Sequence, residues 1–326
     1  MKGADSRGEQ ALPAITVSIV NFNGARFLEE LLLSLTSQTY RRFEVLFIDN
    51  GSTDGSVEFV RSSYPEIKVI AQPDNQGFAR AGNLAMGSSP HDFVALLNTD
   101  LRLGPAWLER LATTMFSDKS IAAVASKLRF HDRPDYLNGV GGAMNRLGYT
   151  WDRGMNQEDR GQLDQPAEVL FASAGAALFR KAAFQEAGGF DEKFFMYHED
   201  VDLCWRLWLL GFRVITAPSA VVYHHFGGAT KESKGMRWRE LLGERNNMRS
   251  LLKNYELPNA IRAIARMMLL RQPASRKLAQ IRNLLWNLAN LPNTLRHRRD
   301  IQRRRVRSDN DLRDLIVQSN HVPVRL

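Results

Sequence analysis

Between residues 14 and 126, short apolar segments rich in β-branched residues alternate with segments of helical periodicity, and this alternation constrains the fold more than any other feature. Strands that alternate with helices are joined by crossover connections, which place neighbouring strands parallel. The sequence therefore predicts an α/β domain in which helices flank a mostly parallel sheet. The predicted strands are 14–21, 44–49, 68–71, 93–98 and 121–126, and the predicted helices are 27–35, 57–63, 77–86 and 106–116.

Polar residues directly follow three of these strands. Asn21 and Asn23 follow the first strand, Asp49 ends the second, and the fourth ends in Asn98-Thr-Asp100. Ligands of parallel sheets bind beyond the carboxyl ends of the strands. A carboxylate at position 49 can accept a hydrogen bond from a base or a sugar hydroxyl, and one at position 100 can hold Mg2+ or Mn2+ together with phosphate oxygens. Both acids also suit tight turns, so a purely structural role stays open.

An acidic cluster follows an aromatic run in the segment 194–206. Its carboxylates are Glu199, Asp200 and Asp202, and apolar residues repeat at helical spacing behind them, which predicts a helix that begins near Asp200. Crowded acids beside buried aromatic rings repel one another and are poorly solvated. At least one pKa is therefore raised, which makes a candidate general base. The alternative is that these acids only cap the helix and suit its dipole.

The segment 127–168, rich in Gly, Asp and Asn, is interpreted as an irregular excursion, or a hairpin, over one edge of the site. The chain returns as a predicted strand at 170–180, where the small residues around Gly175 allow the backbone to approach a ligand closely. No glycine-rich phosphate loop follows the first strand, so phosphate binding of that kind is not supported.

Two adjacent histidines follow the last predicted strands, 214–216 and 220–223. His224 and His225 are plausible Mn2+ ligands, because a neutral imidazole binds transition metals. A satisfied structural histidine is the commoner case, and the spacing does not distinguish the two residues.

Six segments in a fixed order resemble the family 2 glycosyltransferases, and within them the bacterial rhamnosyltransferase-like branch, over roughly residues 16–230. The resemblance implies an A-type glycosyltransferase fold and inverting transfer of a sugar, such as rhamnose, from a nucleotide-diphosphate sugar. The implied acceptor is a saccharide or a polyprenyl-diphosphate-linked sugar used in cell-surface polysaccharide synthesis. The segments are 17–24, 48–56, 75–79, 96–100, 188–192 with 194–206, and 223–230.

The resemblance also implies roles for single residues. Asp200 falls at the catalytic base, with Glu199 beside it. Asp100 is the metal ligand of the family's Asp-x-Asp motif, but Asn98 replaces the first Asp, so the site has one carboxylate fewer. The expected donor-binding residues are Asn21, Asn23, Asp49, Asn75, Gly77, Asn98, Asp100 and Gly175. The expected ligands of Mg2+ or Mn2+ are Asp100 with His224 or His225.

Charge divides the chain. Residues 229–326 hold 22 Lys and Arg against 8 Asp and Glu, a net charge of +14, whereas residues 1–228 carry −5. An acidic first part joined to a basic tail indicates two roles. The tail alternates apolar and basic residues, which is consistent with helices packed on the catalytic domain, with an amphipathic surface on an anionic membrane, or with nucleic-acid binding.

We expect a disordered N-terminus at 1–13, a catalytic domain at 14–230 and a helical basic extension at 231–326. A polyprenyl-linked acceptor favours the membrane interpretation of the tail, with the enzyme peripheral on the cytoplasmic face of the plasma membrane and no nucleic acid bound. The single cysteine fits a reducing compartment. The polar N-terminus does not resemble a signal peptide, and no uncharged apolar run of about 18 residues predicts a membrane span.

Two other functions are compatible with parts of the sequence. A nucleotidyltransferase also uses an α/β sheet and acidic metal sites, but it needs a basic activating motif after the first strand, where this chain offers only Arg26. The other is an inactive domain that binds membrane or nucleic acid. The intact acids and histidines at positions 100, 200, 224 and 225 argue against that loss of activity.

Overall fold

The structure, a computed structural model, describes residues 13–226, 236–269 and 274–317. The strands within these residues are β1 Ile15–Asn21, β2 Phe43–Asp49, β3 Lys68–Ala71, β4 Phe93–Asn98, β5 Leu101–Leu103, β6 Ile121–Phe130, β7 Leu137–Val140, β8 Gly142–Asn145, β9 Thr150–Asp152, β10 Ala176–Arg180, β11 Arg213–His224 and β12 Ile316–Val317. The helices are α1 Ala25–Thr36, α2 Ser56–Ser63, α3 Phe78–Ser88, α4 Trp107–Phe116, α5 Lys181–Glu186, the 3-10 helix η1 Glu192–Phe194, α6 Glu199–Leu209, α7 Met236–Asn254, α8 Leu257–Leu269, α9 Ala274–Ala289 and α10 Leu291–Arg304.

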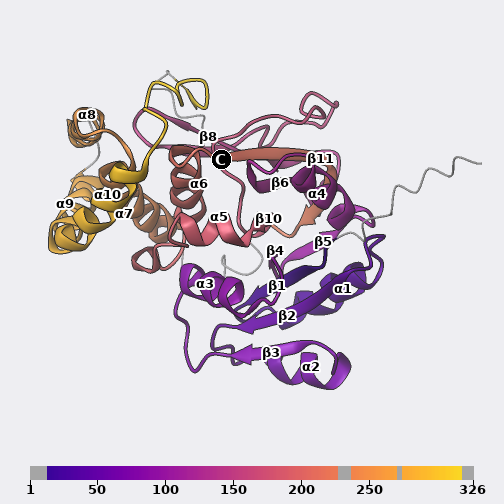
Figure 1. The fold of residues 1–326 in the computed structure, drawn as a ribbon. Helices are drawn as coiled ribbons and strands as arrows, with labels where there is room; N and C mark the ends of the chain where they lie inside the picture. Colours follow the sequence, from indigo (N-terminus) through magenta and orange to yellow (C-terminus); the bar gives the residue numbers. More distant parts are fainter. Residues whose placement is uncertain (1–12, 227–235, 270–273, 318–326) are drawn as a thin grey trace, which may run out of the picture.

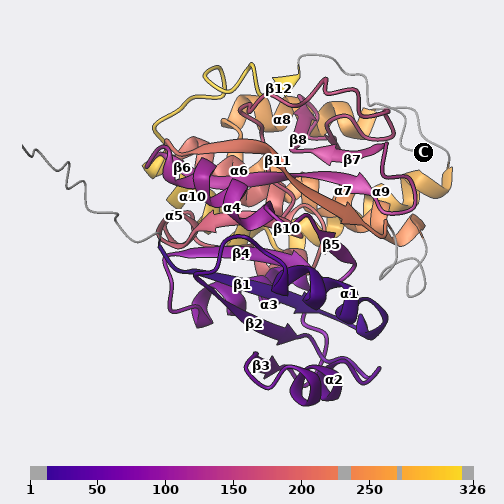
Figure 2. The ribbon, with the colours of Figure 1, turned by 90° about the vertical axis from the view of Figure 1, so that its right-hand side faces the viewer.

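A nine-stranded sheet forms the centre, in the order β3-β2-β1-β4-β10-β6-β11-β5 with β7 beside β6 (Figure 2). The predicted crossover strands β1 to β4 are confirmed, and each adjacent pair among them is parallel. All seven residues of β1 are buried, as expected of a strand covered on both faces. The register pairs Asn21 with Asp49 and Val20 with Asn98, so the polar strand ends meet at one edge of the sheet.

Helices cover both faces of the sheet (Figure 1). The leucines of α1 and the apolar side of α4 pack on one face. Helices α3, α5 and α6 pack on the other, where the apolar side of α6 that follows the acidic cluster is fully buried. This two-layered covering is the α/β architecture that the sequence predicts.

Three predicted strands differ from the structure. The segment 170–180 is a strand only over its last part, β10, and β10 runs antiparallel to both β4 and β6. Its first part leaves the ladder and turns at Ser173, where the carbonyl accepts from the amide of Ala176. The predicted strands 214–216 and 220–223 form one strand, β11, with a register shift between Ala217 and Val221. This irregularity surrounds Pro218, which cannot donate to the ladder.

The described part of the tail packs against the rest of the chain. Helix α7 lies on α6, and α8, α9 and α10 surround α7 (Figure 1). Strand β12 pairs with β8, and Leu312 and Ile316 belong to the same buried cluster as α6. Residues 1–12 of the expected disordered N-terminus and the expected boundary at 230 lie outside the described residues. Among the described helices, none is long and apolar enough to cross a membrane.

The contact between α6 and α7 is ionic and buried. Lys253 Nζ lies 2.6 Å from Asp191 Oδ2 and 2.8 Å from Asp202 Oδ2. Arg249 also binds Asp191, and Arg206 binds Asp202, so two buried acids share three buried cations. Burial alone would raise the pKa of Asp202, but the charges of Lys253 and Arg206 lower it to about 2.

Lys253→Met should lower the free energy of unfolding by about 3–5 kcal/mol, because it leaves buried carboxylate charge without its shared cation. Urea denaturation measures this loss. Lys119→Met is the matched control, since Lys119 is exposed, and should change stability by less than about 0.5 kcal/mol. A loss below about 1 kcal/mol in Lys253→Met would mean that the network contributes little to the fold.

Candidate active site

The strand ends at the edge of the sheet form a hydrogen-bonded cluster. Asn21 Nδ2 donates to Asp49 Oδ1 at 2.8 Å and to Ser52 Oγ at 2.9 Å. The amide of Ser52 donates to the other oxygen of Asp49 at 2.9 Å. Asn21 at the end of β1 and Ser52 in the turn after β2 therefore engage one oxygen of Asp49 each, and the remaining lone pairs of these oxygens can accept further bonds. The carboxylate is rigidly held, which suits a binding role as well as a structural one.

Two neighbouring loops complete this end of the site. Asn23, with a left-handed φ of 52°, accepts a hydrogen bond from the amide of Thr53. Asn75 Oδ1 accepts from Asn50 Nδ2 at 3.0 Å and from the amide of Gly77 at 2.9 Å. These bonds fix the loops after β1, β2 and β3 relative to one another, as a preorganised pocket requires.

Asp100 and His224 face each other at the next strand end. His224 Nε2 lies 3.4 Å from Asp100 Oδ2, and its Nδ1 lies 2.7 Å from Asn138 Oδ1. In the tautomer that donates from Nδ1 to this amide oxygen, Nε2 presents a lone pair toward the carboxylate. Within the described residues, buried Asp100 Oδ1 has no hydrogen-bond partner. Two facing lone-pair donors and an unpartnered buried oxygen fit a divalent cation.

His225 belongs to a different cluster. Its ring stacks on His131 at 3.6 Å between centroids, and its Nε2 lies 2.7 Å from Glu30 Oε2. Although burial alone would raise it, hydrogen bonds from His225 and His131 keep the pKa of Glu30 below its ordinary value. These three side chains could also hold a metal ion, since their ligand atoms lie within 4.8 Å of one another. The guanidinium of Arg102, 3.4 Å from Glu30, opposes a further positive charge.

A short segment connects the metal end of the site to the acidic helix. The carbonyl of Gly175 accepts from the amide of Asn98 at 2.8 Å, and the amide of Ala174 donates to Asp200 Oδ2 at 3.3 Å. A Cβ at position 175 would lie 2.6 Å from Asn98 Nδ2, so the close neighbour that requires glycine here is Asn98. The structure thus brings Asn98 and Asp200 to adjacent residues of one segment.

Glu199 and Asp200 begin α6, where Glu199 is buried and Asp200 is partly exposed. Burial raises the pKa of Asp200, against the opposing effect of the amides of Val201 and Ala174. Burial, followed by the charge of Asp200, raises the pKa of Glu199 well above its ordinary value. Glu199 Oε2 is buried and has no hydrogen-bond partner among the described residues. The raised pKa of Glu199 favours its protonated form, whereas the amides that donate to Asp200 favour its ionised form.

The loop before these acids is strained and clamped from two sides. Phe195, Tyr197 and His198 all have left-handed φ angles, between 66° and 76°. Asn246 of α7 donates from Nδ2 to the carbonyls of residues 194, 196 and 197. On the other side, the carbonyl of Phe195 accepts from the amide of Ala79 and sits so close to Gly77 that no Cβ would fit. The loop is therefore fixed between α3 and α7.

Sequence reasoning missed the residues that support this loop. They are Asn246, Arg249, Ser250, Lys253 and Asn254, which bind the acidic loop, Asp191 or Asp202. Their spacing is a polar stripe along one face of a helix, which by itself is typical of a solvated surface. The sequence feature that could have indicated these residues is the group of acids in α6. Acids that become buried need cations nearby.

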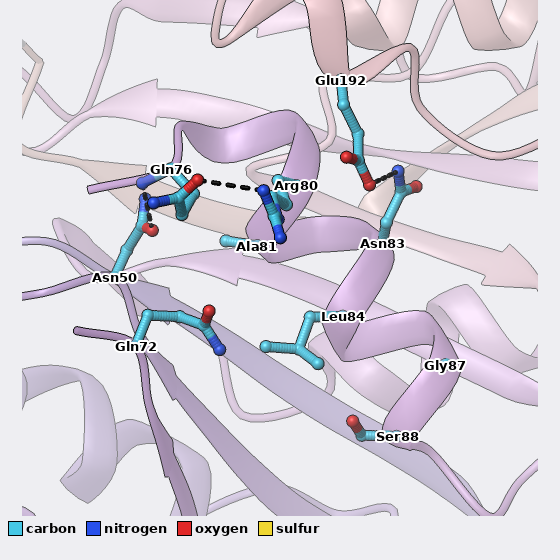
Figure 3. Close-up of a pocket in the computed structure, with 10 residues that line it drawn as sticks. All are labelled: Asn50, Gln72, Gln76, Arg80, Ala81, Asn83, Leu84, Gly87, Ser88 and Glu192. Carbon is cyan, nitrogen blue, oxygen red and sulfur yellow. Dashed lines mark hydrogen bonds between the residues drawn. The ribbon is translucent and has the colours of Figure 1, made fainter. Parts of the chain in front are cut away.

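A surface hollow opens beside α3, and Figure 3 shows its polar walls. Arg80 donates to Gln76, and Asn83 donates to Glu192, so its charged groups are bound to neighbouring side chains. The hollow includes none of the acids at positions 49, 100 and 200. It therefore does not coincide with the cluster at the strand ends. Its lining residues are Asn50, Gln72, Gln76, Arg80, Ala81, Asn83, Leu84, Gly87, Ser88 and Glu192.

Known proteins share this architecture. The chain is 31% identical over 237 residues to an N-acetylglucosaminyl-diphospho-decaprenol L-rhamnosyltransferase of Mycobacterium tuberculosis, covering 66% of this chain and 77% of that one. It is 33% identical over 216 residues to a pre-mycofactocin glycosyltransferase of the same species, covering 64% of this chain and 42% of that one. The solved structure of GalNAc-T7 with UDP, GalNAc and Mn2+ has a TM-score of 0.63 at 16% identity, over 84% of this chain and 55% of that one, which is a likeness of fold.

The fold and the cluster at its strand ends define an enzyme, a glycosyltransferase with the A-type fold. Residues 16–188 match the family model described as glycosyl transferase family 2. The chain belongs to this family and is rhamnosyltransferase-like within it. The family assignment decides against the nucleotidyltransferase alternative.

Proposed function

We propose that the protein transfers a sugar from a nucleotide-diphosphate sugar to a hydroxyl of a lipid-linked saccharide, with inversion at the anomeric carbon. The observation that carries this proposal is the placement of Asp200, a poorly solvated carboxylate of raised pKa held beside the strand ends of the sheet. L-rhamnose is the sugar we favour, because the decaprenol-linked L-rhamnosyltransferase is 31% identical to this chain.

The reaction is a single displacement. Asp200 accepts the proton of the acceptor hydroxyl while the hydroxyl oxygen bonds to the anomeric carbon and the carbon–oxygen bond to the diphosphate breaks. A raised pKa strengthens ionised Asp200 as a base. The raised pKa of Glu199 favours its protonated form, which keeps a second negative charge out of this pocket. Asp202 is unsuited to this role because ion pairs surround it.

Asp49 and Asn21 hold the nucleoside at the other end of the proposed site, and Asn23, Asn75 and Gly77 shape the loops around it. Asp100 and His224 would hold Mg2+ or Mn2+ against the diphosphate, and His225 would serve only if its cluster opened toward that group. When bound, the cation neutralises the charge that develops on the leaving diphosphate. Asn98 and Gly175 carry the segment that connects this end to Asp200.

A polyprenyl-linked acceptor is confined to a membrane, so we propose that the enzyme works as a peripheral protein on the cytoplasmic face of the plasma membrane. The basic tail supports this location, since its net charge of +14 favours an anionic surface. The product would enter synthesis of a cell-wall or cell-surface polysaccharide, as the similarity to the decaprenol-linked relative suggests.

Asp200→Asn should lower turnover by about 10²-fold or more while donor binding stays near normal, because the amide cannot accept the proton. Glu199→Gln should keep turnover within a few-fold of the wild type, because the amide resembles the protonated carboxyl that the structure favours. Screening nucleotide sugars for thermal protection identifies the donor, and steady-state kinetics with that donor then compares the two variants. A large loss of turnover in Glu199→Gln with little loss in Asp200→Asn would instead identify Glu199 as the base.

Removing divalent metal with excess chelator should abolish activity and weaken donor binding, and Asp100→Ala should do the same. His224→Ala should raise the concentration of Mn2+ needed for half-maximal donor binding by about 10-fold or more, since one ligand is lost. His225→Ala is the control and should leave that concentration unchanged. Full activity in chelator, or a larger effect at His225, would contradict the assignment of Asp100 and His224.

A further inference from the structure

Helix α9 turns its apolar side outward. Leu278, Ile281, Leu285 and Leu288 are 48–63% exposed, and their spacing places all four on one stripe of the helix. The stripe of a helix that packs on a protein core normally faces that core. Four large exposed apolar residues in one stripe indicate a surface that a lipid or a protein partner covers.

The opposite side of α9 is polar and buried. Asn283 and Asn287 are each less than 10% exposed, and their Nδ2 groups donate to the carbonyls of Leu241 and Arg245 on α7. Arg245 also stacks on Trp286, with its guanidinium carbon 4.1 Å from the ring centre. These bonds fix the rotation of α9 about its axis. The outward leucines therefore cannot turn inward without breaking buried hydrogen bonds.

Helix α8 adds a second outward row. Its inner side packs through Ala260, Ala263 and Met267, while Leu257 and Ile261 are more than half exposed. Both helices pack on α7 and lie on the outer side of the tail, away from the sheet (Figure 1). The exposed apolar rows of α8 and α9 are together called the apolar face hereafter.

Basic residues border the apolar face. Helices α8 to α10 together contain ten Lys and Arg and a single acid, Asp300. Arg262 and Arg266 are exposed on α8, and Lys277 and Arg282 are exposed on α9. Apolar side chains flanked by cations, with almost no acid, match an anionic lipid surface, where leucines enter the acyl boundary and cations meet the headgroups. A second copy of this chain would bring like charges together.

We propose that the apolar face is a bilayer-docking surface that seats the enzyme on anionic lipid. This inference deepens the proposed function, on which its purpose rests, because docking would place a lipid-linked acceptor beside the catalytic loop. The connection is short: Arg245, whose carbonyl accepts from Asn287 of α9, donates to the carbonyls of Lys193 and Phe194 in that loop. The helices lie on the surface and do not span it.

The test is co-sedimentation of the full chain with vesicles of phosphatidylcholine, with and without about one third phosphatidylglycerol. Ile281→Gln/Leu285→Gln should weaken binding to anionic vesicles by about tenfold or more, because two apolar side chains no longer enter the lipid. Leu33→Gln is the matched control, since Leu33 on α1 is 55% exposed but lies outside the tail. It should bind as the wild type does.

Arg262→Gln/Arg282→Gln should weaken binding at low salt and reduce its salt dependence, because two cations no longer meet the anionic headgroups. Equal binding of Ile281→Gln/Leu285→Gln and the wild type would overturn the proposal. A second combination of results would also overturn the proposal. In it, the wild type does not bind vesicles, and light scattering shows a wild-type dimer that the same substitutions convert to a monomer.

Enzyme kinetics separates this proposal from the proposed function. Ile281→Gln/Leu285→Gln should retain wild-type turnover on a water-soluble acceptor with a short alkyl chain and lose it on a polyprenyl acceptor carried in vesicles. If no acceptor is glycosylated but vesicle binding still depends on Ile281 and Leu285, the proposed function fails and the docking surface stands. Equal loss on both acceptors would mean that the substitutions damage the site and that docking does not explain them.

Discussion

The buried ionic contact between α6 and α7 is the constraint on which the candidate site depends. Asp191 and Asp202 flank the strained loop that precedes Glu199, and neither could remain charged inside the protein without Arg249, Lys253 and Arg206. The tail supplies two of these three cations. The first tail helix is therefore part of the foundation of the site, and the same helix presents Asn246 to the strained loop and carries α9 on its outer side.

This arrangement gives three neighbouring acids different properties. The cations around Asp202 lower its pKa to about 2, burial raises the pKa of Glu199 well above its ordinary value, and the pKa of Asp200 is raised against the effect of two amides. Burial is the largest single influence on the pKa of each of the three acids, and it raises all three. At Asp202 the cations together outweigh burial, so the pKa of this acid is lowered. Environment, rather than residue type, thus singles out Asp200 as the base of the proposed reaction.

Much of the fold could be predicted because alternation of strand and helix patterns is local, and polar residues at strand ends mark one edge of a parallel sheet. The sequence could not distinguish His224 from His225, since their contacts with Asp100 and Glu30 depend on how β11 approaches β5 and α1. It also could not reveal that the polar stripe of α7 is buried or that the leucines of α9 point outward. The polar stripe of α7 and the apolar stripe of α9 are both visible in the sequence. Whether each stripe is buried or exposed depends on contacts with residues far away in the sequence.

The pH dependence of kcat/KM tests the central claim most directly, because it reports the pKa of the base in the free enzyme. Asp200 must be ionised to accept a proton, so activity should rise with pH through its pKa. We expect the acid limb to lie above 3.8, the ordinary value for aspartate, and to persist in Glu199→Gln. An acid limb at or below 3.8, or one that disappears in Glu199→Gln, would contradict the assignment of Asp200 as the base.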